Sequence, residues 1–191
     1  AVYWAHDGSM GGPQCSAAYL AASHNHGGGL RFLVGACGVD PNAVGNTRNG
    51  NTPLHTACLN GHTGVATVLL ALGADPTVAK KSGFTPCMEA AACNSGSVPC
   101  LRALAAGGPG GALGDAVNAL DQYGSTALDW AVRFNKDEAA ACLRDELGGK
   151  RAADLSARRH RASTASGPLP KGEAAPLPEG ADLTAMTDTE L

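Results

Sequence analysis

One short pattern recurs along this chain at a nearly constant spacing. The dipeptide Thr52-Pro53 returns 33 residues later as Thr85-Pro86, each time preceded by Gly-x. Thr126-Ala127 repeats the pattern after 41 further residues, and a weaker copy begins at Ser16, 36 residues before Thr52. A period of roughly 20 to 50 residues is the signature of proteins that stack one small unit. The sequence therefore predicts a repeat architecture.

The copy at residues 50–82 shows the plan of the unit. A threonine followed by proline is a helix-start signal, because threonine caps the first amides and proline is tolerated at the first helical position. We expect a first helix over Pro53–Asn60 that ends at Gly61. Apolar residues on one helical face predict a second helix over Gly64–Leu72. A polar stretch at 77–83 then leads to the next copy.

The letters TPLH, NGH and VLLALGADP, at a period of 33 residues, are similar to those of the ankyrin repeat. The resemblance covers about residues 12–149 in four copies. It implies an all-α fold, an ankyrin-repeat solenoid of stacked helix-turn-helix units with finger loops, plus an extended C-terminal tail. The expected division is an N-terminal segment at 1–11, repeats at about 12–49, 50–82, 83–123 and 124–149, a basic helix-compatible segment at 150–162, and a low-complexity Ala/Pro-rich tail at 163–191.

The copies depart from the family pattern at a few positions. The TPLH histidine is present only as His55, and its counterparts in the other copies are Tyr19, Met88 and Asp129. The resemblance implies that His55 ties adjacent repeats together and that His62, in the NGH turn, hydrogen-bonds to backbone. Pro99 falls near the start of a second helix, where proline is tolerated. The Gly-rich insert at 107–114 accounts for the longer third spacing and is expected to form a flexible loop.

Composition argues against several classes of protein. The formal net charge is −3 and aromatic residues make up 4%, which disfavours a nucleic-acid surface spread over the molecule. The scarcity of large side chains favours thin layers of closely packed helices. The longest apolar run, Val65–Ala74, is too short to cross a bilayer, so we expect no transmembrane segment.

The chain has seven cysteines, an odd number, and no CxxC spacing. Most lie in apolar helical stretches, so we interpret them as small buried side chains in a reducing compartment, with disulfide pairing as the alternative. The expected location is intracellular: cytoplasmic by default, or an organelle if a targeting sequence has been removed. The chain begins at Ala1, which fits a processed product or a fragment of a longer protein.

No group of residues predicts catalysis, a metal site or a cofactor. His24 and His26 lack a cysteine or acidic partner at zinc-site spacing, and the cysteines at 87, 93 and 100 are not closely paired. Cys58 and Cys93 fall in first-helix positions, where small residues pack. The glycine runs at 27–29 and 107–114 are not followed by the Lys-Ser/Thr of a phosphate loop. We expect no small-molecule substrate.

The resemblance implies that the finger tips and first helices line a concave face that contacts a partner protein. Carried onto this chain, the expected partner-binding residues are Arg48, Asn49, Asn51, Leu59, Asn60, Lys81, Ser82, Phe84, Gln122, Tyr123, Ser125, Arg133 and Phe134. Tyr123, Phe84, Arg48 and Arg133 are the expected anchors, because tyrosine, tryptophan and arginine dominate interface energetics. Lys80 and Lys81 add positive charge, which favours a partner with acidic groups.

The end of the chain offers a second candidate contact. Arg158, Arg159 and Arg161 form a basic cluster, and residues 163–191 have too few apolar side chains to fold alone, so we expect them to lie along a partner. Three functions fit these features. The first is a non-catalytic adaptor that binds another protein, the second is a structural subunit of a large assembly, and the third is the repeat portion of a larger enzyme.

Overall fold

The computed structural model describes residues 16–93, 97–107 and 113–155, and these residues form successive pairs of short helices. The elements are α1 (Ala17–Ser23), α2 (Gly27–Gly35), α3 (Pro53–Leu59), α4 (Thr63–Ala71), α5 (Pro86–Ala92), α6 (Ser97–Gly107), the 3-10 helix η1 (Gly114–Asn118), α7 (Ala127–Arg133), α8 (Asp137–Ala141) and the π-helical turn η2 (Cys142–Glu146). Among these described residues there is no β-strand, only an isolated bridge between Asn46 and Asn51.

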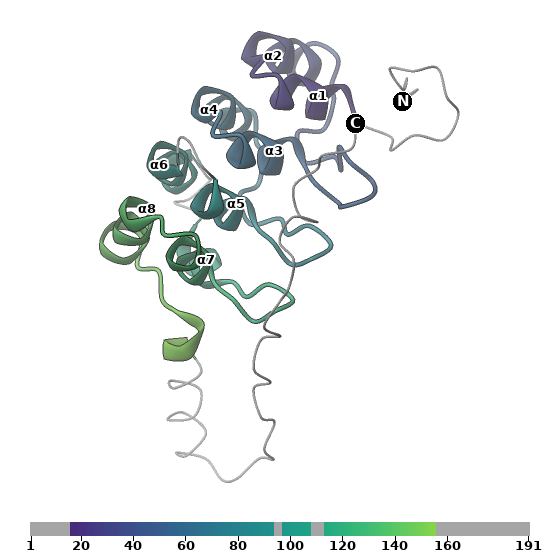
Figure 1. The fold of residues 1–191 in the computed structure, drawn as a ribbon. Helices are drawn as coiled ribbons and strands as arrows, with labels where there is room; N and C mark the ends of the chain where they lie inside the picture. The colour runs from purple at the N-terminus through teal and green to yellow at the C-terminus, as the bar shows by residue number, and fades with distance from the viewer. Residues whose placement is uncertain (1–15, 94–96, 108–112, 156–191) are drawn as a thin grey trace.

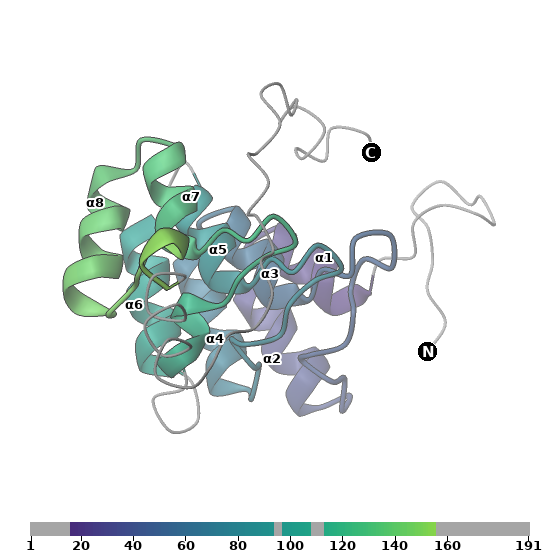
Figure 2. The same cartoon turned by 90° about the horizontal axis from the view of Figure 1, so that it is seen from below.

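The helices stack in two layers (Figure 1). In one layer each first helix contacts the next, in the order α1, α3, α5 and α7, and in the other layer α2, α4, α6 and α8 follow the same order. The loops that lead into α3, α5 and α7 project from the same side of the stack as three successive fingers (Figures 1 and 2). The predicted all-α solenoid with finger loops is confirmed.

The first helices begin at side-chain caps. Ser16, Thr52, Thr85 and Thr126 each accept a hydrogen bond from the backbone N–H three residues later, which satisfies an amide that has no partner inside the helix. The two helices predicted from the best copy, Pro53–Asn60 and Gly64–Leu72, are confirmed to within one residue at each end. The start of α6 confirms that Pro99 is tolerated in the first turn of that helix.

The turns between paired helices need a left-handed backbone. Gly61 has φ +68°, and the residues in the same position after α1 and α7 are Asn25 at φ +58° and Asn135 at φ +54°. Glycine adopts this region freely and asparagine is the side-chain residue that tolerates it best. The sequence therefore ends each of these helices with a residue that can enter the turn.

The core is thin because alanine, cysteine and glycine let the helices approach one another. Ala57, Cys58, Ala90 and Ala91 are at most 1% exposed. Gly107 was expected in a flexible loop, but it is the last residue of α6 and packs on the preceding repeat. A Cβ atom there would lie 2.7 Å from Leu70 Cδ1, so only glycine fits this close contact. Residues 108–112 of the predicted loop lie outside the described residues.

Two histidines join successive repeats, as predicted. His55 Nε2 donates to the carbonyl of Phe84, 3.0 Å away in the next repeat, while its Nδ1 accepts from the Thr52 N–H at 3.3 Å. His62 Nε2 donates to the carbonyl of Ser23 in the preceding repeat, at 3.2 Å. Each imidazole therefore bonds a backbone carbonyl of a neighbouring repeat, and the carbonyl of Ser23 is one that the end of α1 leaves without a partner inside the helix.

Two asparagines make a further clamp between repeats. Asn42 accepts a hydrogen bond from the Asp75 N–H at 2.7 Å and donates to the Gly73 carbonyl at 3.2 Å. Asn118 makes the same pair of contacts with the Lys150 N–H and the Gly148 carbonyl, at 2.7 and 3.4 Å. The chain after α8 is thus held in the way that one repeat holds the next.

Asp129 also fixes the chain that follows the last helix pair. It closes a capping box with Thr126, accepts from the Ala152 N–H at 2.8 Å, and pairs with Arg151 Nε at 2.9 Å. Burial alone would raise the pKa of Asp129, but the Ala152 amide, the Arg151 guanidinium and Thr126 together hold it below its ordinary value. Residues 152–155 are helical and lie within the segment at 150–162 that was predicted to be helix-compatible.

The remaining predictions for this end of the chain concern residues outside the described ones. These are the rest of the basic segment, the tail at 163–191 and the predicted tail contacts Arg158, Arg159 and Arg161. Within the part of the chain that the structure describes, no helix is both long and apolar enough to cross a membrane.

Candidate protein-binding surface

Each finger is a loop closed by a backbone hydrogen bond across its base. The Gly45 N–H donates to the Asn51 carbonyl at 2.7 Å, and the Lys80 N–H donates to the Phe84 carbonyl at 2.9 Å. In the third finger the Asp121 N–H donates to the Ser125 carbonyl at 3.1 Å. A glycine with positive φ turns the chain in every tip, at φ +81°, +80° and +74° for glycines 50, 83 and 124.

The fingers are also bonded to one another. The Lys81 N–H donates to the Asn49 carbonyl of the first finger at 3.1 Å, and the Gln122 N–H donates to the Ser82 carbonyl at 3.0 Å. Lys81 Nζ donates to the Thr47 carbonyl at 2.8 Å. Since these bonds fix each tip relative to the next, the tips form one preorganised surface, which lowers the entropy that binding would cost. We name residues 46–50, 80–83 and 121–124 the fingertip surface.

The structure exposes about half of the predicted partner-binding residues. On the fingertips the exposed side chains are Arg48, Lys81, Gln122 and Tyr123, and at the ends of the first helices they are Leu59, Asn60 and Arg133. Asn49, Ser82, Ser125 and Phe134 are half-buried. Tyr123 is 49% exposed and is the largest apolar side chain exposed on the fingertips.

Two predicted contact residues, Phe84 and Asn51, are corrected by the structure. Phe84 is 4% exposed and its ring centroid lies 4.9 Å from that of Trp130, so it belongs to the core between repeats. Asn51 is 2% exposed. Both residues follow the tip glycine and precede the helix-capping threonine, and their carbonyls accept the bond that closes the finger base. This position therefore turns inward, and neither side chain can meet a partner.

The structure also corrects the prediction that Lys80 adds positive charge to the binding surface. Its Nζ lies 2.6 Å from Glu89 Oε1 and 5.0 Å from the ring centroid of Phe84, and its side chain is 14% exposed. The pair neutralises Lys80 within the fold. Lys81 and Arg48 remain as exposed cations of the fingertip surface, and the carboxylate in that surface, Asp121, is buried.

Asp121 is a residue that the sequence reasoning missed. It is 7% exposed, and its Oδ1 accepts from the amides of Tyr123 and Ser125, both at 2.9 Å. Its Oδ2 accepts from Trp130 Nε1 at 2.8 Å. An aspartate that bonds the amide two residues on is a common turn former, so its place three residues before Gly124 was an available signal. Asp121 sets the position from which Tyr123 projects.

Arg133 is held beside this cluster. Its guanidinium carbon lies 5.4 Å from the centroid of the Trp130 ring, and Phe134 stacks on the same ring at 5.6 Å. A cation over an aromatic face is attracted by the ring quadrupole. Arg133 is thus oriented while it stays exposed.

The buried cysteines of the described residues pack in the core. Burial raises the pKa of the Cys87 thiol to about 12, and it raises those of Cys58, Cys100 and Cys142 as well. A thiol that stays protonated is a poor nucleophile and a poor metal ligand. Cys93 lies just after α5 and not inside a first helix as predicted, although it is buried. None of the six cysteines of the described residues is in a disulfide bond, and Cys37 is the exposed one among them.

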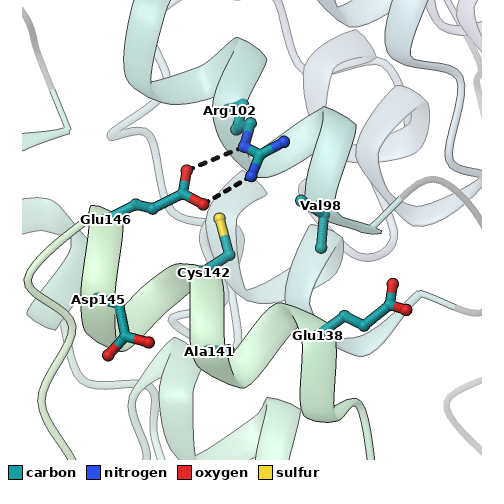
Figure 3. Close-up of a pocket in the computed structure, with 7 residues that line it drawn as sticks. All are labelled: Val98, Arg102, Glu138, Ala141, Cys142, Asp145 and Glu146. Carbon is teal, nitrogen blue, oxygen red and sulfur yellow. Dashed lines mark hydrogen bonds and ion pairs between the residues drawn. The ribbon is translucent and has the colours of Figure 1, made fainter.

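A groove of about 420 Å³ lies on the other side of the molecule, between α6 and the α8–η2 segment. It is lined by Val98, Arg102, Glu138, Ala141, Cys142, Asp145 and Glu146 (Figure 3). Arg102 and Glu146 close one end through two hydrogen bonds of 2.9 and 2.6 Å. The groove is open, and the described residues contain no group of three or more His, Cys, Asp and Glu side chains that could hold a metal.

Comparison with known sequences supports the repeat assignment. Residues 8–80 match the sequence model of the family described as "Ankyrin repeats (3 copies)". This segment belongs to the ankyrin-repeat family. A mouse (Mus musculus) relative, "Ankyrin repeat and SOCS box protein 16", is 46% identical over 65 residues, which is 34% of this chain and 14% of the relative. The chain thus aligns with about a seventh of that relative's length. The helices α5 to α8 continue the stack beyond the matched residues.

Proposed function

We propose that this chain is a non-catalytic adaptor that binds a protein partner through the fingertip surface and the exposed ends of the first helices. Ankyrin repeats generally mediate protein–protein interaction, and the family match places such repeats in this chain. The observation that carries the proposal is the bonding of three successive fingers into one surface, which presents Arg48, Lys81 and Tyr123 to solvent.

The chemistry of this surface favours a partner with acidic groups. Arg48 and Lys81 are exposed at neighbouring tips, and Arg133 lies exposed at the end of α7. Lys80 is paired with Glu89, and Asp121 is buried among its hydrogen-bond donors. Complementary charge speeds encounter, while a half-exposed tyrosine supplies apolar area that orders at low entropic cost.

The proposal is tested by charge reversal at the fingertips. The double variant Arg48→Glu, Lys81→Glu and the single variant Tyr123→Ala serve as baits beside the unaltered chain, and the captured partner is then purified for binding kinetics. The double variant lowers the association rate constant roughly tenfold at low salt, because it reverses the steering charge. Tyr123→Ala raises Kd by at least about fivefold, mainly through faster dissociation.

Arg144→Glu is the matched control. Arg144 is exposed on η2, in the second-helix layer away from the fingers, so its reversal changes net charge by the same amount per residue but leaves the fingertip surface intact. The control binds like the unaltered chain. A partner that loses affinity with Arg144→Glu and keeps it with the fingertip variants would place the binding surface elsewhere.

A further inference from the structure

The side chain of Lys81, which belongs to the second finger, lies across the first finger. Its Nζ donates to the carbonyl of Thr47 at 2.8 Å. Its stem passes Gly50, where a Cβ atom would lie 3.1 Å from Lys81 Cγ. Because glycine has no Cβ, the first finger leaves room for the lysine stem at this point. The two fingers are neighbours in the stack (Figures 1 and 2), so the ammonium group of one is carried onto the other.

This path brings the positive charges of Lys81 and Arg48 together. Arg48 directly follows Thr47, and both cationic side chains are exposed. Since a carbonyl oxygen is only about 3 Å from the Cα atom of the next residue, the Lys81 ammonium lies within about 6 Å of the Arg48 Cα atom. An arginine side chain is as long as this distance, so one anion can contact both groups. We name Arg48 and Lys81 the cation pair.

The charge of the cation pair is not balanced within the described part of the chain. No carboxylate of those residues forms an ion pair with Arg48 or Lys81. The neighbouring Lys80 is paired with Glu89. Asp121, the carboxylate of the fingertip surface, is buried and accepts hydrogen bonds at both of its oxygens. Two like charges that are held close repel each other, so the cation pair favours the binding of an anion.

Hydrogen bonds hold the loop that carries the cation pair in one shape. The Arg48 N–H donates to Asn46 Oδ1 at 3.0 Å. The Lys81 N–H donates to the Asn49 carbonyl at 3.1 Å. An ammonium group has three N–H donors, and the bond to Thr47 uses one of them. The backbone is therefore preorganised, and the exposed ammonium keeps donors for a ligand.

We propose that the cation pair binds a phosphate monoester group on a phosphorylated side chain of the partner protein. This inference rests on the proposed function, since it gives the chemistry of a partner bound at the fingertip surface. A phosphate monoester carries a charge of about −1.5 to −2 at pH 7 and three acceptor oxygens, so it balances both cations and accepts from both. A single carboxylate balances one cation. The guanidinium of Arg48 suits a forked contact with phosphate, and the ammonium of Lys81 acts as a point charge.

The test is a titration of the isotope-labelled full chain with short synthetic peptides, followed by NMR chemical shifts at low salt and neutral pH. Four peptides share one Gly/Ala sequence and carry at the centre a phosphoserine, a serine, a glutamate or two glutamates three residues apart. The phosphoserine peptide shifts the amides of residues 46–50 and 80–83. It binds about fivefold more tightly than the single-glutamate peptide, because it engages a second exposed cation.

Two neutral variants assign this preference to the cation pair. Lys81→Met keeps an unbranched stem across Gly50 and removes the charge, and Arg48→Gln removes the other charge. Each variant lowers the affinity for the phosphoserine peptide about fivefold and removes its advantage over the single-glutamate peptide. Arg144→Gln, on the exposed surface of η2, is the matched control and binds like the unaltered chain. Urea unfolding of each variant confirms that the fold is intact.

Three results would overturn the inference. The first is a phosphoserine peptide that does not bind, or binds no more tightly than the single-glutamate peptide. The second is an affinity that survives both Arg48→Gln and Lys81→Met. The third is equal or tighter binding of the two-glutamate peptide, which would make two carboxylates the occupants.

The failure of this inference is distinguishable from the failure of the proposed function. If the peptides fail but the captured partner still requires Arg48 and Lys81, the adaptor function at the fingertip surface stands and only the phosphate is wrong. A captured partner that ignores the fingertip variants contradicts the proposed function itself, whatever the peptides do.

Discussion

At the scale of single residues, the strongest constraint on this stack is the neutral imidazole of His55. It is fully buried, accepts from Thr52 and donates to the Phe84 carbonyl of the next repeat. Burial is the main reason that its pKa falls from 6.5 to about 4. A proton on Nδ1 would remove the acceptor that Thr52 needs and would leave a buried charge, so the inter-repeat contact depends on the neutral form.

This arrangement makes stability depend on pH. Because the folded pKa of His55 is below the unfolded value, its contribution is complete above pH 6.5 and is lost as the pH falls toward 4. Between pH 7.5 and 5 the loss is about 2 kcal/mol at 1.36 kcal/mol per pKa unit. His55→Met, which copies the residue that stands at this position in the third repeat, removes that part of the pH dependence. Urea unfolding at both pH values measures it, and an unchanged difference would contradict the assignment.

The thiols provide a second test at this scale. In a Cys15→Ser background, which removes the cysteine outside the described residues, Cys37 reacts rapidly with a thiol reagent because it is exposed. The five buried cysteines react only as fast as the fold opens, since the fold covers their side chains. Adding Cys37→Ser abolishes the fast phase. A fast phase that survives this change would show that one of the buried thiols is accessible.

At the scale of helices and loops, Asp129 fixes both the start of α7 and the chain that follows η2. Asp129 accepts from the capping Thr126 and from the Ala152 amide. Asp129→Ala therefore lowers the free energy of unfolding by about 1 to 3 kcal/mol, from a lost cap and buried donors left without an acceptor. The same variant increases tryptic cleavage at Lys150 and Arg151, because the segment there loses its hydrogen bond and ion pair with Asp129.

Arg151→Ala is the control for this prediction. The Arg151 side chain is 53% exposed, and an exposed ion pair contributes at most about 1 kcal/mol. The control variant therefore unfolds nearly like the unaltered chain. Equal losses in the two variants would mean that the ion pair, and not the amide contacts of Asp129, holds the segment.

The helices and their order could be predicted from the sequence because the signals are local. A helix starts at Thr-Pro, ends at Gly or Asn and has one apolar face, and each of these signals involves only a few neighbouring residues. The sequence therefore predicts the bounds of α3 and α4 to within one residue. The orientation of finger residues depends on the neighbouring repeat. Phe84 and Lys80 look like surface residues in sequence, but they turn toward Trp130 and Glu89, which lie in another helix or repeat. The contact of Gly107 with Leu70 was missed for the same reason, because Leu70 lies in the preceding repeat.

At the scale of the whole molecule, the repeats depend on one another. In the second repeat, His55 bonds the Phe84 carbonyl of the third repeat, and the Asp75 amide bonds Asn42 of the first. Leu70 of the second repeat packs against Gly107 of the third. A stack of this kind unfolds as one unit, because each repeat buries its apolar face only on its neighbours. Deletion of residues 50–82 therefore abolishes cooperative unfolding, measured by circular dichroism in urea. Removal of residues 109–111 from the Gly-rich insert is the control and leaves one cooperative transition, since loop length costs little.

We propose that the molecule binds its partner through the fingertip surface. Amide hydrogen exchange of the full chain, measured with and without its partner, tests this most directly, because it reports on every backbone amide of both faces in one experiment. The predicted result is slower exchange in residues 46–51, 80–84 and 121–125 in the complex, with no change in α8 and η2. Slower exchange confined to the groove between α6 and α8, with the fingertips unchanged, would contradict it.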